Sequence, residues 1–142
     1  MSVAVVDANL FIAATHDHPL SGKVPVVFGH YGEPCAPEQI VPEAANGLRR
    51  VVRRGLLEQR NAVAALHTLP DMIALVSMRD AGPEAFTMSA RLDHGVYDCF
   101  YLVLAERLAC PLVSGDRVFL RKAATIATVP LLDLYDLPGN LP

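Results

Sequence analysis

The chain opens with four small or β-branched apolar residues at positions 3–6, and this run ends abruptly at Asp7. A short apolar run of this kind predicts a strand that is buried on both faces, as in the parallel sheet of an α/β protein. Similar runs predict strands at residues 72–76, 111–114 and 129–132. Because segments with helical periodicity separate them, we expect a three-layer α/β sandwich with a mostly parallel central sheet of about five strands flanked by helices.

Apolar residues recur at threes and fours in the intervening segments. This spacing predicts helices over residues 38–52, 56–69, 83–92, 97–109 and 117–124. The helix at 97–109 is apolar on all sides in its middle, so we expect it to be largely buried. Asn9 is expected to cap a short helix that ends at Ala14, and residues 15–37, rich in Gly, Pro and His, are predicted to be irregular or partly helical.

The length of 142 residues suits one domain with its own core, so residues 1–142 are predicted to form a single domain. The hydrophobic content of 52% argues against disorder, yet no apolar stretch approaches the length of a membrane span. The N-terminal residues lack the basic segment of a secretory signal, so we expect a cytoplasmic protein. Cys35, Cys99 and Cys110 are odd in number and show no C-x-x-C spacing, and we expect buried, reduced thiols.

Three acidic residues lie at the boundaries of apolar segments. Asp7 and Asp116 follow predicted strands, and Asp98 begins the most apolar helix. A carboxylate at such a boundary is costly unless it is hydrogen-bonded, paired or bound to a metal, and ligands bind at the carboxyl ends of parallel strands. Each of the three could instead cap a helix. No Lys or Arg lies near Asp7 or Asp98 in the sequence, so we favour a shared divalent cation, Mg²⁺ with Mn²⁺ as an alternative.

Four blocks of sequence carry a family resemblance. They are V-V-D-A-N at 5–9, A-P-E-Q-I-V-P-E-A-A-N-G-L-R-R at 36–50, Y-D-C-F-Y-L-V-L-A-E-R-L at 97–108 and P-L-V-S-G-D-R-V-F at 111–119. In order, spacing and context they resemble the PIN-domain family, in particular the VapC-like toxins of bacterial toxin–antitoxin pairs. The resemblance implies a parallel sheet between helices and one pocket that gathers four acids: Asp7, Glu43, Asp98 and Asp116.

The resemblance also assigns roles to single residues. It implies that Asp7, Asp98 and Asp116 are the main metal ligands, directly or through water, and that Glu43 is a ligand or the general base. Ser114 stands where the family usually has Thr or Ser, and is expected to orient a water or an acid, with Asn9 helping in the same way. Some relatives have a further acid just after the fourth. Here Arg117 and Val118 follow Asp116, which leaves the number of metal ions open.

The function that the resemblance implies is a magnesium-dependent endoribonuclease that hydrolyses RNA phosphodiester bonds as the toxin of a VapBC-like pair. The expected partners are an RNA substrate, a cognate antitoxin that inserts a segment into the acidic pocket, and a second copy of the chain in a homodimer. Contact with DNA is expected only through an antitoxin complex. The alternatives are a stand-alone RNA-processing PIN nuclease and a catalytically silent PIN binding module. The four intact acids count against the silent module, and the small size favours the toxin over the stand-alone nuclease.

The charge distribution leaves one question open. The net charge of −3 argues against a protein that coats nucleic acid, but Arg49, Arg50, Arg53 and Arg54 form a local basic cluster. These arginines form either a solvated helix face or contacts to RNA phosphates or to a partner. The T-H-D-H segment at 15–18 offers two imidazoles and a carboxylate, but alternate positions in a loop rarely make a metal site unaided, so we expect none there.

Overall fold

A computed structural model of the protein describes residues 2–142. These residues form one five-stranded sheet in the order β3-β2-β1-β4-β5, and every neighbouring pair of strands is parallel. The strands are β1 (Val3–Val6), β2 (Glu33–Pro37), β3 (Ala74–Val76), β4 (Leu112–Ser114) and β5 (Leu131–Asp133). The predicted α/β fold with a parallel sheet of about five strands is therefore confirmed.

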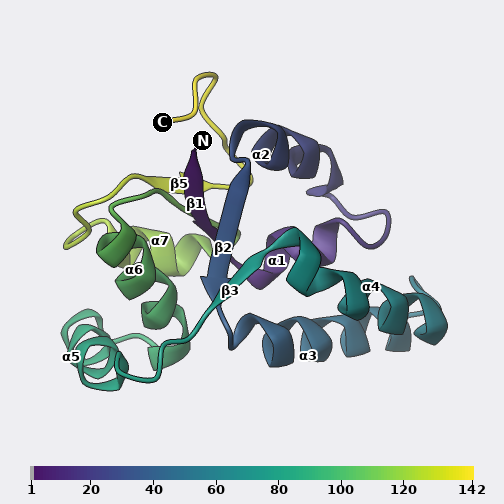
Figure 1. Ribbon diagram of the computed structural model, residues 1–142, viewed down its shortest axis with the longest axis horizontal. Coiled ribbons are helices and arrows are strands. Elements are labelled where there is room, and N and C mark those ends of the chain that lie inside the picture. The colour runs from purple at the N-terminus through teal and green to yellow at the C-terminus, as the bar shows by residue number, and fades with distance from the viewer. Residues whose placement is uncertain (1) are drawn as a thin grey trace.

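Within residues 2–142, seven α-helices flank the sheet. They are α1 (Ala8–Ala13), α2 (Val24–His30), α3 (Ile40–Arg53), α4 (Gln59–Met72), α5 (Gly82–Leu92), α6 (Val96–Leu108) and α7 (Arg117–Ala123). Figure 1 shows α5 and α6 on one side of the strands and α1, α3 and α4 on the other. In space, α6 packs on β1, β2 and β4, while α3 packs between α1 and α4. None of the helices in residues 2–142 is long and apolar enough to cross a membrane.

The strand order reverses its direction at β1. From β1 the chain builds outward through β2 and β3, then returns to the other side of β1 to add β4 and β5. In such sheets, ligands bind at the carboxyl ends of the strands where the order reverses. The register pairs Val6 with Val113, so the next residue in each segment, Asp7 just after β1 and Ser114 at the end of β4, lies at this point of the sheet, where the two are side by side.

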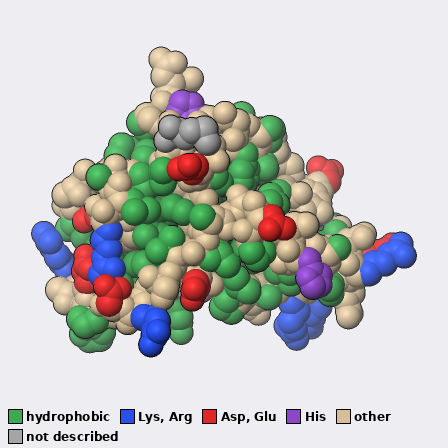
Figure 2. Space-filling model, viewed as in Figure 1, with side chains coloured by type: hydrophobic (Ala, Val, Ile, Leu, Met, Phe, Trp, Pro, Cys, Tyr) green, Lys and Arg blue, Asp and Glu red, His purple; other side chains and the backbone are tan. Residues whose placement is uncertain are grey.

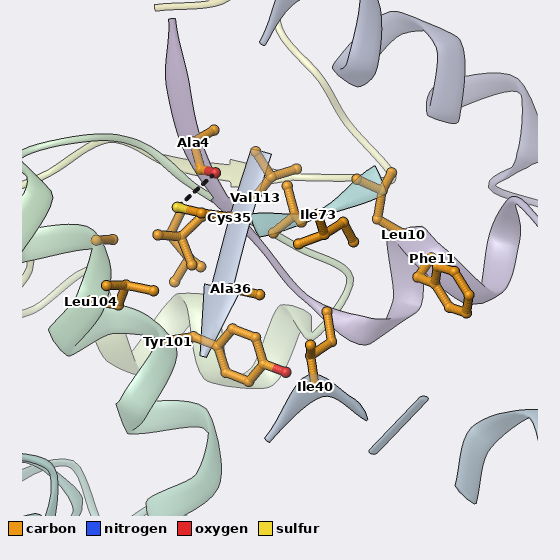
Figure 3. Close-up of a cluster of buried hydrophobic side chains, with 14 of the residues drawn as sticks. Ala4, Leu10, Phe11, Cys35, Ala36, Ile40, Ile73, Tyr101, Leu104 and Val113 are labelled. Atoms are coloured by element: carbon orange, nitrogen blue, oxygen red, sulfur yellow. Dashed lines mark hydrogen bonds between the residues drawn. The ribbon is translucent and has the colours of Figure 1, made fainter. Parts of the chain in front are cut away.

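The core is built around α6, as the apolar character of this helix predicts. Cys99 and the run from Tyr101 to Ala105 are all buried. Figure 3 shows the ring of Tyr101 among the buried side chains of the sheet and α3, with its hydroxyl at the edge of the cluster. The same view shows the thiol of Cys35 donating to the carbonyl oxygen of Ala4 at 3.5 Å.

The three cysteines are free and buried, as expected from their number and spacing. Burial raises the pKa of Cys35 and of Cys99 to about 11, so both thiols stay protonated near neutral pH. A protonated thiol is a poor nucleophile and a poor metal ligand. These cysteines therefore serve as packing groups.

The expectation for residues 15–37 is wrong in part. The segment contains a short 3₁₀ turn at Ser21–Lys23 and the helix α2, which fit a partly helical stretch, but it ends in the strand β2. This strand lies inside the sheet between β1 and β3 although it carries Pro34 and Pro37. Proline donates no backbone hydrogen bond and normally argues against an interior strand, which is why the pattern concealed it.

Some predicted boundaries also shift. The residue that caps α1 is Asp7, not Asn9, because its carboxylate accepts hydrogen bonds from the backbone N–H groups of Asn9 and Leu10. The last strand lies at Leu131–Asp133, two residues beyond the predicted start. At Gly47 a Cβ atom would overlap the side chain of Ile12, so glycine at this position permits the close approach of α1 and α3.

The basic side chains gather in particular regions of the surface. Figure 2 shows hydrophobic side chains over the middle of one face, with Lys and Arg side chains gathered toward its two lower ends. Asp and Glu side chains are scattered over the same face, and some of them lie among the Lys and Arg side chains.

Candidate active site

One cavity at the carboxyl end of the sheet gathers the four predicted acids. It has a volume of about 230 Å³, and Asp7, Glu43, Asp98 and Asp116 all line it. Asp7 follows β1, Asp116 follows β4, and the other two acids lie in the first turns of α3 and α6. Segments that are far apart in the sequence therefore meet at the point where the strand order reverses.

Asp7 is held by hydrogen bonds on both carboxylate oxygens. Its Oδ1 accepts from the backbone N–H groups of Asn9 (3.1 Å) and Leu10 (3.4 Å). Its Oδ2 accepts from the hydroxyl of Ser114 (2.7 Å), the backbone N–H of Gly115 (2.9 Å) and the side-chain amide of Asn9 (3.4 Å). These donors fix the side chain between the start of α1 and the end of β4, and both Ser114 and Asn9 orient this acid.

Asp98 and Asp116 lie close together beside His94. The Nε2 atom of His94 is 2.7 Å from Oδ2 of Asp98, and the imidazole packs against the ring of Phe119. His94, Asp98 and Asp116 each place one potential ligand atom within 4.8 Å of the other two. Asp116 also caps α7, because its Oδ1 accepts from the backbone N–H of Phe119 at 3.0 Å. The side chain of Asp116 therefore both caps α7 and lines the cavity.

Glu43 is held by two donors from different elements. The amide of Gln39 donates to Oε1 and the hydroxyl of Tyr101 donates to Oε2, both at 2.9 Å. Gln39 in turn donates to the carbonyl oxygen of Tyr97 at 2.7 Å, which ties the start of α3 to the start of α6. Pro42, which precedes Glu43, lies within the first turn of α3 and does not displace it from the cavity.

The electrostatics of the cavity oppose full ionisation. Burial raises the pKa of Asp7 above its usual value, although several hydrogen bonds act in the opposite direction. Burial also raises the pKa of Glu43, with a further contribution from the charges of Asp98 and Asp7. The pKa of Asp98 is raised by burial and by the neighbouring charge of Asp116. Buried carboxylates that repel one another are suited to hold a hard divalent cation.

Four residues in or beside the cavity were not assigned to it from the sequence, although Arg50 was left open as a contact to RNA or to a partner. His94 contacts Asp98, Tyr101 contacts Glu43, and Asn46 and Arg50 line the cavity. His94 stands four residues before Asp98, and Arg50 stands seven after Glu43 on the same helix, so helical spacing could have indicated both. A basic side chain therefore lines the cavity in the folded protein, although no Lys or Arg lies near Asp7 or Asp98 in the sequence.

The buried hydroxyl of Ser114 links two acids, and its removal has a predictable cost. It donates to Asp7 and accepts from the backbone N–H of Asp116 at 3.0 Å. We expect Ser114→Ala to lower the free energy of unfolding by about 1 to 2 kcal/mol, because a buried N–H and a buried carboxylate each lose a partner. Thermal denaturation measures this loss. Ser114→Thr keeps the hydroxyl and should lie closer to wild type; equal losses in both variants would assign the effect to packing alone.

The fold and the cavity define an α/β protein with a carboxylate site at the reversal point of a parallel sheet. The sequence profile of the PIN domain matches residues 4–125. This match covers most of the chain, and the protein belongs to the PIN domain family. No curated protein matches the sequence.

Solved structures repeat this fold at low sequence identity. PAE2754 from Pyrobaculum aerophilum aligns with a TM-score of 0.71 and 19% identity, over 94% of this chain and 85% of that one. VapBC2 from Rickettsia felis, solved with a DNA fragment from its promoter, aligns with a TM-score of 0.64 and 12% identity, over 92% and 98%. FitAcB from Neisseria gonorrhoeae aligns with a TM-score of 0.65 and 12% identity, over 94% and 99%. At these identities the likeness concerns the fold.

Proposed function

We propose that the protein is a Mg²⁺-dependent endoribonuclease and the toxin of a toxin–antitoxin pair. The observation that carries the proposal is the meeting of Asp7, Glu43, Asp98 and Asp116 in one cavity at the reversal point of the sheet. The fold supports it, because VapBC2 and FitAcB are among the structures that share the architecture. The VapC-like toxins that the sequence resembles act in such pairs.

The residues of the cavity divide into groups that hold a cation and groups that hold those ligands in place. Asp98 and Asp116, with Asp7 across the cavity, are the side chains that would hold Mg²⁺. When bound, the ion supplies positive charge that offsets the carboxylates and polarises a phosphodiester. His94 and Ser114 orient Asp98 and Asp7 through hydrogen bonds, as residues behind metal ligands commonly do.

In this proposal Glu43 is the general base that accepts a proton during hydrolysis. Gln39 and Tyr101 fix both of its oxygens, and burial raises its pKa toward neutral pH, where a general base is most effective. The attacking water would lose its proton to this carboxylate as the new oxygen–phosphorus bond forms. The leaving oxygen of the broken phosphodiester would take a proton from solvent.

Growth arrest in cells tests the toxin role. Expression from an inducible promoter should stop growth for the wild-type chain and for Asp71→Asn, which alters an exposed acid of α4 that does not line the acidic cavity. Asp7→Asn should remove the arrest at equal protein level. Arrest by all three proteins would contradict the proposed site, and no arrest by any of them would contradict the toxin role.

The purified protein tests the activity itself. It should cleave RNA but not single-stranded DNA of the same sequence in Mg²⁺, and a chelator should stop cleavage. Co-expression with the product of a short adjacent reading frame should suppress both cleavage and arrest. Cleavage without suppression by any adjacent gene would favour the stand-alone nuclease over the toxin.

A further inference from the structure

A second cavity adjoins the acidic one and has the opposite charge. It has a volume of about 410 Å³ and shares Asn9, Ile12 and Arg50 with the acidic cavity. We infer that this second cavity, formed by Arg50, Arg54, His16 and His18, is a subsite for the two phosphates of single-stranded RNA next to the phosphodiester that is cleaved. The inference rests on the proposed function, because it places the flanking part of the same substrate.

The arginine cluster of α3 is divided between two flanks of the helix. Arg50 and Arg54 line the second cavity with residues of α1 and the loop after it. Arg49 and Arg53 line a different groove, of about 300 Å³, whose other wall is the mostly apolar face of α4. All four side chains are exposed. The two pairs thus carry the same charge at the same spacing, but only the pair Arg50 and Arg54 continues from the acidic cavity.

The distance along α3 suits a neighbouring nucleotide. Glu43, Arg50 and Arg54 follow one another on the same flank, with the acid in the first turn and the arginines in and just after the last. At a rise of 1.5 Å per residue, Arg50 lies roughly 10 Å beyond Glu43 and Arg54 roughly 16 Å beyond it. If the phosphodiester to be cleaved lies at the acids, the next phosphates of the same RNA strand therefore lie beside Arg50 and Arg54.

The two histidines are held in place by the loop that carries them. The Nδ1 atom of His18 accepts from the backbone N–H of Leu20 at 3.0 Å, so its Nε2 atom carries the proton and remains a donor. Thr15 lies 3.0 Å from Nδ1 of His16, and the two imidazoles meet edge to face. Ser21 closes the loop, because its hydroxyl lies 2.8 Å from the carbonyl oxygen of Ala13 and accepts from the backbone N–H of His18.

Charge complementarity favours a polyanion in this cavity. Its lining carries two arginines and one carboxylate, Asp17, which leaves a net charge of +1 before either imidazole is protonated. The acidic cavity by itself repels phosphate, and Arg50 stands at the boundary between the two. A phosphate contact here holds the strand without reading its sequence, as most contacts to nucleic acid backbones do. The volume also lies in the range of small-molecule sites.

Two double variants test this assignment. Arg50→Gln/Arg54→Gln and Arg49→Gln/Arg53→Gln remove the same charge from the same helix at the same spacing. For cleavage of single-stranded RNA, we expect the first to raise KM about 10- to 100-fold with kcat within about threefold of wild type, because charge-assisted contacts to phosphate are lost. The slope of log KM against log salt should fall by about 1.4, which corresponds to two phosphates of a single strand. The second variant should stay within about threefold in KM.

A probe that needs no cleavage separates this inference from the proposed function. Inorganic pyrophosphate is added and the NMR signals of the imidazole protons are recorded. The signals of His16 and His18 should move in the wild type and in Arg49→Gln/Arg53→Gln, but not in Arg50→Gln/Arg54→Gln. If this pattern holds while RNA is not cleaved, the subsite stands and the proposed function fails. If RNA is cleaved with equal KM changes in both double variants, the subsite is overturned. If Arg50→Gln/Arg54→Gln keeps the wild-type KM for RNA but no longer binds the antitoxin, the subsite is also overturned, and these arginines contact the partner protein instead.

Discussion

The Asp98→Asn variant is expected to lose RNA cleavage by a factor on the order of 10³ and, without metal, to unfold at a higher temperature than the wild type near pH 8. Asp98 faces Asp116 in the cavity, and its pKa is raised by burial and by that neighbouring charge. The amide keeps an oxygen for the hydrogen bond from His94, now 2.7 Å from Oδ2, and removes one negative charge. Loss of activity together with a gain in stability would distinguish a functional site from a structural one.

The gain in stability follows from the direction of the pKa shift. Because the pKa of Asp98 is higher in the folded protein than in the unfolded chain, the folded state binds more protons between the two values, and the free energy of unfolding falls as the pH rises through that interval. The side chain is 36% exposed, so solvent screens the repulsion, and we expect Asn to restore about 1 kcal/mol. That amounts to about 4 °C in Tm.

Calorimetry of the metal-free proteins at pH 5 and pH 8 measures the difference. The wild type should lose stability between the two values more steeply than Asp98→Asn. Asp71→Asn, which changes an exposed acid, should follow the wild type at both. A variant that is less stable at pH 8 would mean that the carboxylate is stabilising there, and wild-type cleavage by Asp98→Asn would place the reaction elsewhere.

Most of the fold could be predicted from the sequence because four of the five strands contain a short run of apolar residues. The strand β2 was missed because Pro34 and Pro37 gave it the composition of a loop, and its pairing depends on β1 and β3, which lie far away in the sequence. The predicted cap of α1, Asn9, was wrong by two residues for a different reason. Asp7 was already expected to be a functional acid, and the structure shows that the same carboxylate also caps the helix.

The candidate site was predictable to the extent that single residues carry a signal. Asp7, Asp98 and Asp116 stand at apolar boundaries, whereas Glu43 was indicated only by the family resemblance. Apart from the roles that the resemblance gave Ser114 and Asn9, the contacts that hold these acids were not predicted, because they depend on how helices pack. Tyr101 reaches Glu43 from α6, and only the packing of α6 near the start of α3 brings these two side chains within 2.9 Å. The division of the arginine cluster likewise depends on α1 and α4 lying on opposite flanks of α3.

Binding of Mg²⁺ to the wild-type protein is expected to release protons and to raise Tm. Asp7, Glu43 and Asp98 all have raised pKa values, caused first by burial, so the metal-free cavity retains protons at a pH where exposed carboxylates have lost theirs. A divalent cation replaces those protons. At a concentration one hundred times Kd, the ion should stabilise the fold by about 2.7 kcal/mol, which is about 8 °C or more in Tm.

Titration calorimetry in two buffers of different ionisation enthalpy measures the released protons directly. The release should be largest at mildly acidic pH and should decline as the pH rises above the raised pKa values, while the affinity for Mg²⁺ increases over the same range. Asp98→Asn should release fewer protons and bind the ion more weakly, whereas Asp71→Asn should match the wild type. Equal heats in both buffers at every pH would show that the cavity is already fully ionised. In that case the burial of Asp7 would have to be compensated by its hydrogen bonds from Ser114, Gly115, Asn9 and Leu10.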